Sequence, residues 1–101
     1  MCSSDLEVVD AAEALRLGIV QEVVEPARLL PRAGEIAEMI AAKSPVAVAA
    51  AKEATRAALS LPLADGLKLE TALFQLCFAS EDKAEGVRAF LEKREPIFPG
   101  R

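Results

Sequence analysis

The stretch SEDKAEGVRAFLEKREPIFPG, residues 80–100, holds the clearest structural signals in the chain. Ser80 is a good N-cap residue, and the acidic residues after it suit the positive end of a helix dipole. Lys93 and Arg94 place positive charge at the other end, and a proline two residues later prevents the helix from continuing. The stretch therefore predicts a capped helix followed by a proline-bounded tail.

Similar signals predict helices along most of the remaining sequence. Asp10 stands three residues before Glu13, the spacing of a capping box, and Gly18 is suited to end the helix in a left-handed conformation. Ser44 and Pro45 together are typical of a helix start. The predicted helices are 11–17, a helix that ends near residue 43, 46–59 and 63–79.

The segment IVQEVV, residues 19–24, is the one plausible strand, because it is rich in β-branched residues and lies between a glycine and a proline. A single strand cannot form a sheet, so its partner would be a loop, another subunit or sequence outside this chain. The predicted fold class is mainly α, with at most one short strand.

Composition limits the function classes. The chain has 101 residues, 52% of them hydrophobic, which indicates at most one domain. A net charge of -4 argues against nucleic-acid binding. Neither a signal peptide nor an apolar run long enough to span a membrane is present in the sequence. Two cysteines do not form the disulfide framework of a secreted protein, so we expect a cytoplasmic location and no membrane partner.

The helix 63–79 is apolar around most of its circumference and needs cover on more than one side. Cys77 within it is expected to pack as an inert thiol. With no histidine in the chain, Ser-His-Asp and Cys-His catalysis and histidine-based zinc sites are excluded, and no metal site is predicted.

Several polar residues have a plain structural interpretation. Glu81, Asp82 and Glu85 are expected to form a solvated face that caps their helix. Gly86 inside that helix indicates close packing against a neighbour, because glycine there costs about 1 kcal/mol relative to alanine. Lys52 is expected on an exposed strip with its charged neighbours.

Three blocks in order, DAAEALRLGIVQEVV, SPVAVAAAKEA and ETALFQLCFASEDKAEGVRAFLEKREPIF, resemble the C-terminal third of the enoyl-CoA hydratase/isomerase (crotonase) superfamily. The resemblance covers residues 8–98. It implies that residues 7–101 are the C-terminal helical, trimerisation segment of the α/β crotonase (ClpP/crotonase-like) fold.

The resemblance also implies a function: an enzyme, a lyase or isomerase, that acts on acyl-CoA thioesters in fatty acid metabolism such as β-oxidation, with hydration of a 2-enoyl-CoA as the default reaction. In the family, two backbone N–H groups polarise the thioester carbonyl and carboxylates move protons beside it. These groups normally precede this segment, so no catalytic residue is expected here and the isolated chain should be inactive. Coenzyme A enters only as part of the substrate, and the whole enzyme is expected to be a homo-oligomer, a trimer or hexamer.

Phe90 and Lys93 match family positions that bring an aromatic face and an ammonium group to the adenine and phosphate end of CoA. Each residue also has a structural interpretation: Phe90 as part of an apolar core stripe with Val87 and Leu91, and Lys93 as a residue that only favours the helix end. The alternative to an enzyme segment is a stand-alone helical module that self-associates or binds a partner without catalysis.

Residues 1–6, MCSSDL, depart from the family pattern. Cys-Ser-Ser-Asp-Leu is also the translation of a common sequencing-adapter end. The prediction is that this leader is not native and that the open reading frame is truncated.

Overall fold

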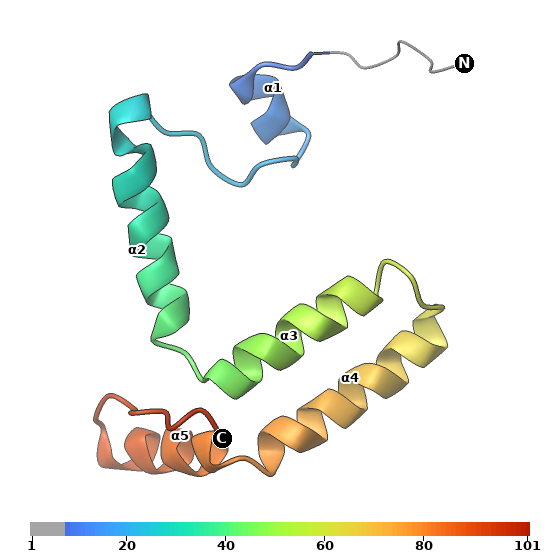
Figure 1. Ribbon diagram of the computed structural model, residues 1–101, viewed down its shortest axis with the longest axis vertical. Helices are drawn as coiled ribbons and strands as arrows, with labels where there is room; N and C mark the ends of the chain where they lie inside the picture. The colour runs from blue at the N-terminus through green and yellow to red at the C-terminus, as the bar shows by residue number, and fades with distance from the viewer. Residues whose placement is uncertain (1–7) are drawn as a thin grey trace. The chain divides into compact units, whose positions relative to one another are not determined.

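The computed structural model describes residues 8–101, so the predicted non-native leader, residues 1–6, lies outside the described residues. The chain divides into two units, Met1–Glu35 and Ile36–Arg101, which are described separately. Figure 1 shows helices joined by short connections, with no strand among the described residues. The elements are α1 (Ala11–Arg16), a 3-10 turn η1 (Pro26–Arg28), α2 (Leu29–Ala41), α3 (Pro45–Ala57), α4 (Leu63–Phe78) and α5 (Glu81–Glu92).

In the first unit, α1 is capped as its sequence predicts. The Glu13 N–H donates to Asp10 Oδ1 at 2.8 Å. At the other end Gly18 has a φ of 75°, the left-handed conformation that a side chain disfavours. The Gly18 N–H donates to the Leu15 carbonyl and the Ile19 N–H to the Ala14 carbonyl. These two bonds are those of a Schellman motif, so the predicted glycine stop is confirmed.

The predicted strand at 19–24 is wrong, because these residues have irregular backbone. A strand needs a neighbour to take up its N–H and C=O groups, and the described residues supply none. The segment is held instead by side chains. Arg32 of α2 donates through Nε to both carboxylate oxygens of Glu22, at 2.9 and 3.0 Å.

In the second unit, α3 and α4 lie side by side as an antiparallel pair, and α4 also contacts α5. Ser44 caps α3 by accepting from the Ala47 N–H at 3.2 Å, and Pro45 fills the first helical position. Ser80 caps α5 by accepting from the Lys83 N–H at 3.1 Å. Both predicted helix starts are therefore confirmed.

These helices bury little apolar surface. Among the described residues, the buried hydrophobic side chains are Leu73 of α4 and Ala89 of α5. Cys77 is partly buried, with Sγ 4.0 Å from the Val46 carbonyl. Many large apolar residues of the second unit stay exposed: Ile36, Met39, Ile40, Leu59, Leu61, Leu63, Leu67, Phe74, Leu76, Phe78, Val87, Phe90, Leu91 and Ile97. The chain therefore leaves α4 without the cover that its sequence requires.

No helix within residues 8–101 combines the length and the apolar character needed to cross a bilayer. The same residues contain no cluster of three or more histidine, cysteine, aspartate or glutamate side chains placed to hold a metal ion.

Candidate functional site

The carboxyl end of α5 and the tail after it form a dense polar cluster around Glu85. Arg94 donates to this carboxylate from both terminal nitrogens, from Nη1 to Oε1 at 2.6 Å and from Nη2 to Oε2 at 3.1 Å. The Ile97 N–H donates to Glu85 Oε1 at 3.0 Å, and Arg94 Nε donates to Glu92. The Arg94 hydrogen bond, followed by the Ile97 N–H, lowers the pKa of Glu85 to about 2. The pair is therefore ionised at any physiological pH.

Lys93 lies in the turn after α5, between Glu92 and Arg94 of this cluster. Its φ of 54° and ψ of 44° place it in the left-handed region, where it is the only non-glycine among the described residues. The Lys93 N–H donates to the Phe90 carbonyl and the Arg94 N–H to the Ala89 carbonyl, which again makes a Schellman motif. Glycine usually fills this position, because a side chain there costs roughly 1–2 kcal/mol.

This turn corrects one expectation. The sequence predicted Lys93 and Arg94 in the last turn of the helix, but α5 ends at Glu92. Lys93 therefore stands in the turn beyond the helix, and its backbone does not follow the helical direction. The prediction failed because it considered only the favourable effect of positive charge at the end of a helix. It did not include the hydrogen bonds from Arg94 to Glu85.

The two residues matched to a CoA contact are both accessible. Phe90 is 82% exposed, so it is not a core residue of this chain, and its stripe neighbour Leu91 is exposed as well. Phe90 precedes Lys93 by three residues and supplies the carbonyl that the Lys93 N–H binds. An exposed aromatic residue in the last turn of α5 and an exposed lysine just beyond the helix are a combination suited to a base joined to phosphate.

The amino end of α5 holds a buried carboxylate. Asp82 is 1% exposed, accepts from Ser44 Oγ at 2.5 Å and accepts from the Gly100 N–H at 2.7 Å. Its own N–H donates to the Arg101 carbonyl. Burial raises the pKa of Asp82, but the hydrogen bonds from Ser44 and from backbone N–H groups outweigh it, so the pKa lies below its usual value.

The expected solvated acidic face is therefore wrong for two of its three members. Asp82 and Glu85 lie three residues apart, on one side of α5, and both bind the tail. Glu81 is exposed as expected, in an ion pair with Arg101 at 2.9 Å. The i, i+3 spacing of the two carboxylates was the available signal, since a tail turned back by prolines brings N–H groups to that side.

Gly86 directly follows Glu85 and faces the tail. A Cβ placed on it would lie 3.5 Å from Phe98 Cε1, an ordinary contact distance. The neighbour that the sequence predicted is thus the chain's own tail, although the approach does not exclude a methyl group.

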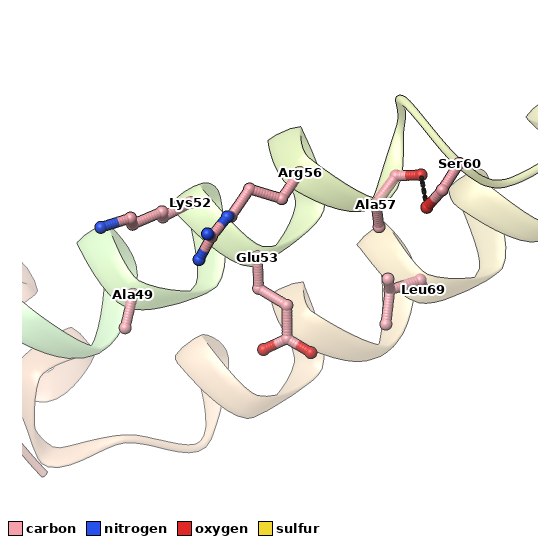
Figure 2. Close-up of a pocket in the computed structure, with 7 residues that line it drawn as sticks. All are labelled: Ala49, Lys52, Glu53, Arg56, Ala57, Ser60 and Leu69. Carbon is pink, nitrogen blue, oxygen red and sulfur yellow. Dashed lines mark hydrogen bonds between the residues drawn. The ribbon is translucent and has the colours of Figure 1, made fainter.

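A second feature is an open hollow of about 640 Å³ between α3 and α4 (Figure 2). Lys52, Glu53 and Arg56 line it from α3 and Leu69 from α4. The three charged residues are exposed, as predicted for Lys52. Ser60 also lines the hollow, but its hydroxyl donates to the Ala57 carbonyl at 3.2 Å, and this hydrogen bond ties it to its own turn.

The comparisons with known proteins agree with this architecture. A family model described as enoyl-CoA hydratase/isomerase matches residues 6–101. The chain belongs to the enoyl-CoA hydratase/isomerase family. The resemblance first seen in three sequence blocks is thereby confirmed.

Relatives of this enoyl-CoA hydratase/isomerase family chain include a probable enoyl-CoA hydratase of Rhizobium meliloti, 50% identical, which aligns with 93% of this chain and 37% of its own length. A crotonyl-CoA hydratase of Syntrophomonas wolfei is 40% identical, over 91% of this chain and 35% of the relative. The crystal structure of an enoyl-CoA hydratase/isomerase from Mycobacterium paratuberculosis superposes with a TM-score of 0.89 at 38% identity, covering 96% of this chain and 38% of that one.

The chain thus spans a little over a third of the length of these relatives. The prediction of a mainly α segment of the crotonase fold is confirmed, because the helices superpose on part of a crotonase-fold enzyme and residues 8–101 contain no strand.

Proposed function

We propose that this chain works as the C-terminal helical part of an enzyme that acts on acyl-CoA thioesters, with hydration of a 2-enoyl-CoA as its reaction. The observation that carries the proposal is the family match over residues 6–101 in a chain whose helices bury hardly any apolar side chain. Exposed faces on α4 and α5 suit packing against a larger body and against other copies of the enzyme. The groups that polarise the thioester and move protons belong to that body, so the chain alone should not turn over substrate.

The role proposed for this segment is to contact the CoA moiety. Phe90 offers an exposed ring on which adenine can stack, and Lys93 offers an ammonium group to phosphate. The remaining elements of the proposal come from the family: a homo-oligomeric enzyme, a trimer or hexamer, located in the cytoplasm and active in fatty acid or related acyl-CoA metabolism.

A chimera tests the proposal. Residues 8–101 replace the matching region of the Syntrophomonas wolfei relative, and hydration of crotonyl-CoA is followed by absorbance. The chimera should be active and the 101-residue chain alone inactive. Robust turnover by the chain alone would contradict the assignment of the catalytic groups to another part of the enzyme.

Lys93→Ala in the chimera tests the CoA contact. It should raise KM for crotonyl-CoA by about tenfold and change kcat much less, since a hydrogen bond to a charged group is worth about 1.5 kcal/mol or more. Lys68→Ala is the matched control, because Lys68 is an exposed lysine on α4 that pairs with Asp65 of the same helix. An unchanged KM in Lys93→Ala would exclude the contact.

The exposed apolar faces also favour a second candidate, a stand-alone helical module that self-associates without catalysis. Sedimentation separates the two. A discrete oligomer of the isolated chain, together with a chimera that cannot hydrate crotonyl-CoA, would favour the module.

A further inference from the structure

The two Schellman turns of this chain differ in one respect. The turn after α1 has Gly18 at its left-handed position, and the turn after α5 has Lys93. The backbone hydrogen bonds are the same in both turns. The N–H of the residue with positive φ and the N–H of the residue after it both donate to carbonyls of the preceding helix. A lysine at a position that favours glycine carries a conformational cost, so other contacts must hold the turn against it, and a use of its side chain would account for a lysine there.

The Glu85 carboxylate supplies that hold. It lies on α5 before the turn and binds two groups after it, the guanidinium of Arg94 and the N–H of Ile97. The two parallel bonds to Arg94 fix the direction of its side chain as well as the distance. Because Arg94 directly follows Lys93, fixing Arg94 limits the backbone angles that Lys93 can adopt.

We propose that Glu85 and Arg94 are positioning residues, which hold the left-handed turn so that Lys93 and Phe90 present their side chains together to the nucleotide end of an acyl-CoA. This inference rests on the proposed function and deepens it. Arg94 itself is not the phosphate-binding cation, since its nitrogens are already engaged by Glu85 and Glu92. The ammonium next to it, on exposed Lys93, takes that part.

Arg94→Gln in the chimera separates positioning from simple stabilisation. It should raise KM for crotonyl-CoA about threefold to tenfold and leave kcat within about twofold, because the ammonium is still present but no longer held in place. Arg94→Lys should not restore KM, since an ammonium group cannot make the two-pronged contact with Glu85.

Arg88→Gln is the matched control. Arg88 lies on the same helix and approaches the same carboxylate, but at 3.9 Å and with its side chain 64% exposed. Removing it changes the net charge as Arg94→Gln does and leaves the turn untouched, so KM should stay at the value of the unmodified chimera.

A conformational measurement on the full chain accompanies the kinetics. With ¹³C and ¹⁵N labels, the carbon shifts and the N–H to Hα coupling of Lys93 report its φ directly. The left-handed signature should be present in the unmodified chain and in Arg88→Gln, and weakened in Arg94→Gln and Glu85→Gln.

The outcomes are distinct. A raised KM for Lys93→Ala with an unchanged KM for Arg94→Gln overturns the positioning role and leaves the CoA contact in place. An unchanged KM for Lys93→Ala overturns the contact itself and this inference with it. Loss of soluble chimera shows that Arg94 serves stability, and a fall in kcat equal to the fall in kcat/KM leaves KM unchanged; either result overturns the inference.

Discussion

Lys93 and Gly18 stand at equivalent places in two helix ends, yet only the glycine suits the left-handed backbone. The contrast means that the effect of Lys93 on stability can be measured by substitution. The backbone strain of Lys93 and the role proposed for its side chain act in opposite directions, so one substitution should improve stability and damage binding.

Lys93→Gly should therefore raise the free energy of unfolding of the chain by about 1 kcal/mol, because glycine adopts positive φ without the clash of a Cβ atom. Urea unfolding followed by circular dichroism measures the change. Lys93→Ala is the control, since it removes the ammonium but keeps Cβ and should give no such gain. A glycine variant no more stable than the alanine variant would show that the turn is unstrained.

Glu85 gives the pH dependence of the same region. Its pKa is lowered from 4.5 to about 2, first by the Arg94 hydrogen bond and then by the Ile97 N–H. A carboxyl with a depressed folded pKa stabilises the fold above its unfolded pKa, and this contribution is lost as the pH falls through the folded value. The melting temperature of the chain should thus fall between about pH 4.5 and pH 2.

Glu85→Gln should make that fall shallower, because the amide does not titrate. Some slope will remain, since the pKa of Asp82 is also lowered. Thermal melts at several pH values measure both slopes. Parallel melting curves for the variant and the unmodified chain would mean that the ion pair is not formed in solution.

At the scale of elements, α5 and the tail behave as one piece. The tail lies back along the helix, with Gly100 and Arg101 bound to Asp82 at its amino end and Ile97 bound to Glu85 near its middle. Phe98 covers Gly86, the residue after Glu85. The amino half of the helix is therefore tied to the tail.

Gly86→Ala tests this packing. We expect it to raise the free energy of unfolding by about 0.5–1 kcal/mol, because alanine is the better helix former and its methyl group would meet Phe98 at an ordinary contact distance. Thermal or urea unfolding measures the gain. Gly34→Ala on α2 is the control, since its Cβ would meet nothing within 4 Å. A loss of stability confined to Gly86→Ala would show that the tail lies closer than in this structure.

Sequence reasoning found the helices because their starts carry local signals. Asp10, Ser44 and Ser80 each accept a hydrogen bond from an N–H three residues later, as the cap patterns predict. It failed where a segment depends on distant partners. The segment 19–24 has strand-like composition but no neighbour to pair with, and Asp82 is buried by a tail that begins more than ten residues later.

The candidate site rests on Phe90 and Lys93, whose contact with CoA came from resemblance to a family and stays a prediction. The structure places Phe90 in the last turn of α5 and Lys93 just beyond it, both exposed. The hydrogen bonds of Glu85 with Arg94 and with the Ile97 N–H were not predicted, because nothing in the sequence marks these three residues as partners. Only the folded tail brings them together.

At the scale of the whole molecule, the exposed apolar residues raise the question of what α4 packs against. Leu73 is 8% exposed, whereas Leu76 in the next turn of the same helix is 66% exposed. If α4 packs against a larger body, the first leucine should matter in every context, and the second should matter only where that body is present.

Leu76→Ser should therefore change the helicity and unfolding of the isolated chain very little, because its side chain is already in water there. In the chimera the substitution should lower the yield of assembled enzyme, since a polar serine side chain would replace the leucine side chain where α4 packs against the rest of the chimera. Leu73→Ala is the control and should destabilise both proteins, by about 2–5 kcal/mol if no collapse fills the cavity. Circular dichroism and sedimentation measure these effects. A chimera that assembles equally well with Leu76→Ser would mean that this side of α4 faces solvent in the assembled chimera, and the packing argument for α4 would then fail.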